Sequence, residues 1–150
     1  MEDKCDALAG LHAFSGCDTV GAIHGVGKTK AYKKLIYQRQ YITLFRELGT
    51  GFSPSPKFCK VVEAFTCDLY DQECMDVTKA RVKLFKSGKC SERDLPPNKD
   101  CLHEHIQRAN YQGAVHRRTL ECRPDIPAPE CHGWKMAGDF LEVDCVAEFE

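Results

Sequence analysis

The segment that decides the fold is a short glycine-rich turn leading directly into a basic helix: residues 23–31, Ile23-His-Gly-Val-Gly-Lys-Thr-Lys-Ala31. Glycine permits positive φ and, because it has no Cβ, lets another group approach the backbone closely. Val26 lies between the two glycines and is expected to anchor the turn in the core. Ala31 is small enough for two helices to cross tightly. The segment therefore predicts a helix-hairpin-helix element over residues 16–36.

The same turn has the features of an anion site. A helix that begins near Lys28 points its free N–H groups, and the positive end of its dipole, toward the glycines. Backbone N–H groups recognise phosphate but not base identity, so binding is expected to be independent of sequence and sensitive to salt. The predicted nucleic-acid-binding residues are Gly25, Val26, Gly27, Lys28, Lys30, Lys33 and Lys34. The alternative interpretation is a tight helix–helix turn with solvated lysines.

The distribution of charge favours the anion site. The chain of 150 residues has a net charge of −1. Residues 24–46 nevertheless contain four lysines, two arginines and no acidic residue, and the segments on both sides are acidic overall. A basic segment of this kind is typical of a surface that faces an anion.

The remaining pattern predicts a mainly α-helical protein with a small C-terminal β-hairpin. Apolar periodicity and capping residues indicate helices over residues 5–15, 28–38, 41–48, 56–69, 76–86 and about 22 residues after Asn98. Ile36 is expected to point inward with Ala31 and Leu35, and Leu120 to lie on the apolar face of the last helix. Alternation over residues 134–143 indicates the hairpin. The regions 1–48 and 49–150 are expected to pack as one domain.

Composition excludes several classes of protein. No apolar run is long enough to span a membrane, and the acidic start does not resemble a signal peptide. The ten cysteines have irregular spacings and form no Cys-x-x-Cys pair, so we expect reduced thiols that act as small apolar side chains. These features favour an intracellular, nuclear protein.

The turn also resembles a known family. The resemblance rests on Gly16-Cys-Asp18, Ile23, Gly25-Val-Gly27 and Ala31, which occur at matching offsets. This pattern is similar to the helix-two-turn-helix region of the flap endonuclease (PIN-like) superfamily, although Thr19 replaces the usual tyrosine. The match covers about residues 8–36. The nuclease core that precedes the motif in that superfamily is expected to be missing from this protein.

The resemblance implies particular ligands. It implies that the turn binds the backbone of duplex DNA, that Asp18 helps to hold a catalytic Mg²⁺ ion, and that the carbonyl of Ile23 contributes to a site for a monovalent cation such as K⁺. Hydrolysis by two metal ions requires several converging carboxylates. Asp18 could equally be an N-cap that accepts backbone hydrogen bonds.

A second resemblance covers the C-terminal half. Three segments, Leu95-Pro-Pro97, Arg108-Ala-Asn-Tyr-Gln112 and Pro129-Glu-Cys-His-Gly-Trp134, are similar to those of a family of animal proteins often found near mobile elements. This resemblance implies no activity.

Other candidate sites lie in the same half of the chain. Zinc could be bound by a set drawn from Cys101, His103, His105, His116, Cys122, Cys131 and His132, although the spacing matches no common zinc finger. A basic track could be formed by Arg108, His116, Arg117 and Arg118, or these could form a solvated face. Tyr111 and Trp134 could stack on bases, but packing in the core or against the hairpin is the simpler interpretation.

These observations lead to one principal functional hypothesis and two alternatives. The principal hypothesis is sequence-independent binding of the DNA phosphate backbone by a truncated, non-catalytic relative of the flap endonucleases. The first alternative is a Mg²⁺-dependent, structure-selective nuclease fragment that needs an upstream core. The second is a protein-interaction module.

Overall fold

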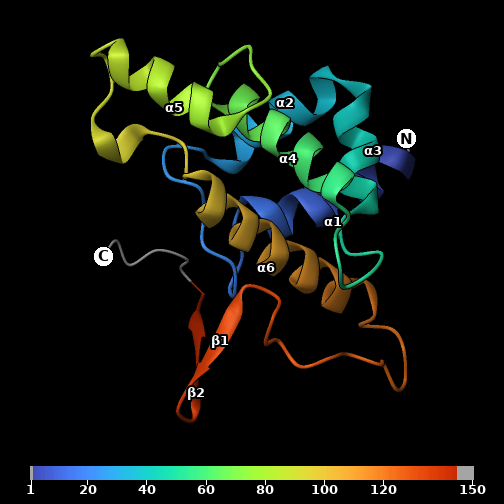
Figure 1. Ribbon diagram of the computed structural model, residues 1–150. Coiled ribbons are helices and arrows are strands. Elements are labelled where there is room, and N and C mark those ends of the chain that lie inside the picture. Colours follow the sequence, from blue (N-terminus) through green and yellow to red (C-terminus); the bar gives the residue numbers. More distant parts are fainter. Residues whose placement is uncertain (1, 145–150) are drawn as a thin grey trace.

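The structure, a computed structural model, describes residues 2–144 and is mainly helical with one small sheet (Figure 1). The helices are α1 (Glu2–Ser15), α2 (Lys28–Tyr37), α3 (Arg39–Glu47), α4 (Pro56–Leu69), α5 (Val77–Lys86) and α6 (Lys99–Arg117), with a 3₁₀ turn, η1 (Glu92–Asp94), before α6. The strands are β1 (Trp134–Ala137) and β2 (Phe140–Val143). The predicted fold class, mainly α with a C-terminal hairpin, is confirmed.

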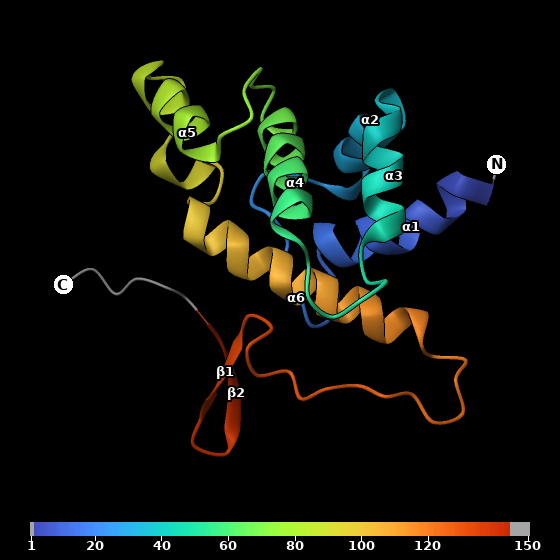
Figure 2. The same cartoon turned by 45° about the vertical axis from the view of Figure 1, so that its right-hand side comes forward.

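The helices surround one apolar core. In Figure 2, α3, α4 and α5 stand side by side above α6, and α1 runs between α3 and α6. Phe14, Phe45 and Phe65 meet at the centre, where their ring centroids are 4.8–6.0 Å apart and the rings are tilted or edge-on. Such aromatic pairs add to the stability gained by burial. The core draws side chains from all six helices.

Three helices begin where the sequence predicts them, because a polar side chain caps each one. The hydroxyl of Ser55 accepts a hydrogen bond from the N–H of Phe58 at 3.1 Å, with proline next in the chain. Asp76 and Asn98 accept equivalent bonds at the starts of α5 and α6. Each cap satisfies a backbone donor that a helix leaves unpaired.

Two apolar positions differ from the prediction. Ile36 is 41 % exposed, because α2 buries only the stripe that contains Ala31 and Leu35. Leu120 is 97 % exposed, because α6 ends at Arg117, short of the predicted 22 residues. There the Arg117 guanidinium donates to the carbonyl oxygens of Leu48 and Arg46, both at 2.8 Å. This contact ties the last turn of α6 to the end of α3.

The hairpin projects from the helical body in both views (Figures 1 and 2). Its strands are antiparallel, with Trp134 opposite Val143. The ring of Trp134 packs edge-on against Tyr111 of α6, with 5.5 Å between ring centroids. Arg108 of α6 donates to the carbonyl of Gly133 at 2.9 Å. The packing interpretation of Tyr111 and Trp134 is therefore confirmed.

The stability of the fold should depend on pH because His105 is buried with a lowered pKa. Its Nε2–H donates to the carbonyl of Phe14 at 2.8 Å, and burial, followed by the charge of Arg108, lowers its pKa below the usual 6.5. The unfolded chain therefore takes up a proton first as the pH falls through 6.5. The free energy of unfolding should be greatest above that pH and should fall by up to about 1.4 kcal/mol for each pH unit below it.

Urea denaturation at pH 7.5 and pH 5.5 tests this. His105→Gln should reduce the pH dependence while keeping an N–H donor, and His12, whose pKa is also lowered, should account for part of what remains. His103→Gln, which changes an exposed histidine of the same helix as His105, should retain the pH dependence. Equal pH dependence in the two variants would show that His105 is not the titrating group.

Candidate nucleic-acid interface

The turn before α2 has the shape that the sequence predicts. Ile23 and Val26 are each only 7 % exposed and anchor the turn in the core. The N–H of Val26 donates to the carbonyl of Ile23 at 3.1 Å, and Gly25 has a φ of 71°. The hydroxyl of Tyr70, at the end of α4, donates to the carbonyl of His24 at 2.8 Å. The turn is therefore held from both sides.

Five backbone N–H groups gather at this end of α2 without an acceptor. They belong to Gly25, Gly27, Lys28, Thr29 and Lys30, and none has a hydrogen-bond partner within residues 2–144. A Cβ atom built on either glycine would meet nothing within 4 Å. The turn therefore combines unpaired donors with open space beside both glycines, which allows close approach of an oxyanion.

Lys28 does not supply the mobile charge that the sequence predicts. Its ammonium nitrogen is 2.6 Å from the carbonyl oxygen of Gly16, 3.2 Å from the hydroxyl of Ser15 and 3.1 Å from Nδ1 of His12. It thus binds the C-terminal end of α1, where a cation is favoured by the helix dipole and by unpaired carbonyl groups. Together with burial, this cation lowers the pKa of His12.

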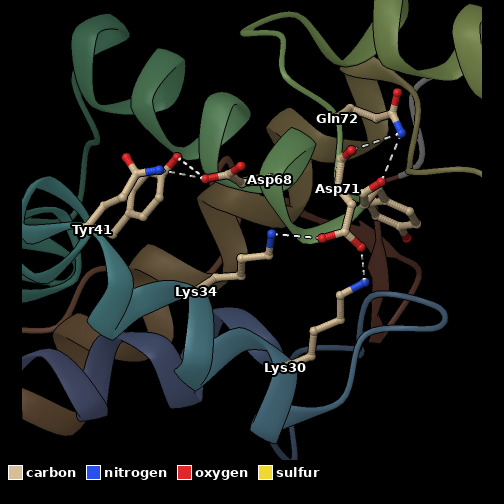
Figure 3. Close-up of polar contacts among 8 residues, drawn as sticks. Lys30, Lys34, Tyr41, Asp68, Asp71 and Gln72 are labelled. Carbon is tan, nitrogen blue, oxygen red and sulfur yellow. Dashed lines mark hydrogen bonds and ion pairs between the residues drawn. The ribbon is translucent and has the colours of Figure 1, made fainter.

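Lys30 and Lys34 lie on the other flank of α2 and share one partner. Their ammonium nitrogens are 3.0 and 2.8 Å from the carboxylate of Asp71, as Figure 3 shows. Hydrogen bonds from Lys34 and then Lys30 hold the pKa of Asp71 below its usual value. Asp71 lies in the turn after α4 with a φ of 55°, and the Gln72 side chain donates to its carbonyl oxygen.

The predicted cluster of lysines is therefore divided between partners. Lys33 is exposed, and its ammonium has no partner among the residues that the structure describes. Lys28 binds α1, and the other two lysines are paired with Asp71. The basic segment is therefore not a uniform cationic surface. The sequence analysis missed Asp71 as a residue of this interface. It lies 41 residues after Lys30 in the chain, in a turn with no distinctive motif.

Asp18 does not have the surroundings of a metal ligand or an N-cap. It lies in an exposed bend, and no helix begins beside it, so the capping interpretation is wrong. Within residues 2–144, no group of three or more His, Cys, Asp or Glu side chains could hold a metal ion. The donor set around Asp18 thus does not fit the Mg²⁺ ion that the resemblance implies. The expected monovalent cation at the Ile23 carbonyl stays a prediction.

The zinc site and the basic track considered in the second half of the chain are not formed among the residues that the structure describes. The zinc candidates between residues 101 and 132 are not brought together into a site in the described part of the chain. The proposed basic track is not free to bind nucleic acid. Arg108 and Arg117 donate to backbone carbonyls, and the guanidinium of Arg118 lies 4.7 Å from the centroid of the Phe52 ring.

Among the helices described, none is both long enough and apolar enough to cross a membrane. No protein-family model matches the chain, and neither curated proteins nor solved structures match it.

Proposed function

We propose that the turn at residues 23–31 binds the phosphate backbone of DNA independently of base sequence. One observation carries the proposal: five backbone N–H groups are unpaired at an open glycine turn that begins a basic helix. Such donors, together with the positive end of the helix dipole, favour a phosphate oxyanion. Since backbone groups contact phosphate and not base edges, duplexes of unrelated sequence should bind equally well.

The surrounding side chains define the electrostatic part of the interface. Lys33 is available to a phosphate as it stands, whereas Asp71 competes with a phosphate for Lys30 and Lys34. Lys33 is exposed, and Lys30 and Lys34 are half-buried on the flank of α2 that faces Asp71, so lysines continue along the helix beyond the turn. Each lysine that contacts a phosphate releases a counterion, and affinity should therefore fall steeply as salt is raised.

The Gly27→Val variant tests the proposal. Gly27 has an extended backbone, with a φ of −79°, which valine adopts readily. A Cβ atom there meets nothing within 4 Å, so valine adds bulk beside the unpaired N–H groups without a backbone clash. Binding of a fluorescent duplex, measured by anisotropy at about 50 mM salt, should weaken at least about tenfold.

Gly51→Val is the matched control, because Gly51 is also exposed, has open space around it and lies outside the turn. This variant should bind within about twofold of the wild type. No binding by the wild-type protein at this salt concentration would refute the proposed function. Equal binding by both variants would show that DNA binds elsewhere on the molecule.

A further inference from the structure

Helix α5 carries a second basic surface, separate from the turn. Its ten residues include Lys79, Arg81, Lys83 and Lys86 and no acidic residue. All three lysines, Lys79, Lys83 and Lys86, are exposed; Lys79 lies near the charge of Asp76, and within residues 2–144 no ion pair is found for Lys83 or Lys86. Both ribbon views place this helix at the outer edge of the bundle, where it packs mainly against α4 (Figures 1 and 2).

An apolar strip runs beside these cations. The helix buries only Val77 and Ala80. Val82 is 48 % exposed and Phe85 is 66 % exposed. Residues three apart lie on one face of a helix, so the two exposed side chains are neighbours. Val82 and Phe85 thus form a short apolar strip between the basic side chains of α5.

The same two side chains, Val82 and Phe85, also line a surface hollow. It has a volume of about 310 Å³ and is lined by Arg81, Val82, Phe85, Lys86, Glu92 and Leu95. Leu95 is 8 % exposed and closes one side. The Arg81 guanidinium donates to the carbonyl of Pro96, which fixes the segment after η1 against α5. The hollow is thus built from two elements held together by a hydrogen bond.

We propose that α5 and this hollow form a docking surface for an acidic amphipathic helix of a partner protein. Such a helix lays an apolar side chain into a groove at every third or fourth position. Its carboxylates would face the unpaired lysines of α5, so the two surfaces are complementary in charge. A nucleic acid offers phosphate but no alkyl side chain for the hollow, and the apolar strip is small for insertion into a membrane.

The test uses a synthetic helical peptide of about 16 residues, with leucine and phenylalanine on one face and glutamate on the other. Binding to the full chain is measured by fluorescence anisotropy. A peptide with lysine in place of each glutamate is the control ligand. The acidic peptide should bind, and the basic peptide should bind at least about tenfold more weakly.

Matched variants locate the surface. Phe85→Ser should weaken binding at least about fivefold, whereas Met75→Ser, which changes an apolar side chain that is 73 % exposed, should have no effect. Lys83→Glu with Lys86→Glu should weaken it at least about tenfold. The control is Lys57→Glu with Lys60→Glu, a pair of exposed lysines on α4. All four proteins should give the wild-type circular dichroism spectrum.

Three results would overturn the proposal: no binding of the acidic peptide, equal binding of both peptides, or no effect of Phe85→Ser. A duplex DNA or a phosphatidylserine vesicle that binds in place of the peptide and depends on Phe85 would assign the surface to that ligand instead. These outcomes are independent of DNA binding at the turn, because Gly27→Val leaves α5 unchanged.

Discussion

The Asp71→Asn variant should bind duplex DNA about tenfold more tightly than the wild-type protein at about 50 mM salt. In the free protein the carboxylate of Asp71 accepts from both Lys30 and Lys34, as a phosphate oxyanion would. Asparagine keeps the shape but not the charge, and it tolerates the positive φ found there. The variant thus frees two ammonium groups without altering the turn.

The dependence on salt gives an independent measure of the same effect. Each further phosphate contact steepens the slope of log affinity against log salt by about 0.9, so Asp71→Asn should steepen it by between about one and two. Because the pKa of Asp71 lies below its usual value, the wild-type carboxylate stays charged and competes at every pH of interest.

Glu73→Gln separates this ion-pair effect from a general change of charge. Glu73 is exposed and lies two residues from Asp71 in the same turn, and its substitution changes the net charge equally. It should raise the affinity by no more than about twofold. If the two variants bind DNA equally well, the lysine pair takes no part in the interface. If neither they nor the wild type binds, the proposed function itself is wrong.

The Gly10→Ala variant should be less stable than the wild type by about 2–3 kcal/mol, the cost of overpacking a core. In an ordinary helix interior, replacing glycine with alanine stabilises the protein by about 0.5–1 kcal/mol. At Gly10 we expect the same substitution to destabilise it. Gly10 is buried where α1 crosses α3. A Cβ atom there would overlap the carbonyl oxygen of Phe45, which is backbone and cannot rotate away, and would lie 3.2 Å from Cβ of Leu48.

Urea denaturation followed by far-ultraviolet circular dichroism measures this effect. Ala9→Gly is the matched control, since Ala9 is exposed on the same helix. It should cost only the difference in helix propensity, about 1 kcal/mol or less. A Gly10→Ala protein that is more stable than the wild type would show that α1 and α3 cross less closely than the structure has them.

Local features of the chain could be predicted from the sequence because their causes are local. Ser55, Asp76 and Asn98 cap the helices that follow them, since a cap needs only a side-chain oxygen within three residues of the donor that it satisfies. The open turn around Gly25 and Gly27 follows for the same reason. Helix type, the starts of the three capped helices and the anchoring of the turn by Val26 were therefore determined by the sequence alone.

The partners of the charged side chains were decided only by the tertiary structure. Lys28 and Lys34 lie six residues apart in one basic helix, yet one binds the end of α1 and the other binds Asp71. Arg117, predicted as part of a basic track, instead joins α6 to the carbonyls at the end of α3. Long side chains reach whatever acceptor the packing of helices brings near them, and that packing depends on apolar contacts spread over the whole chain.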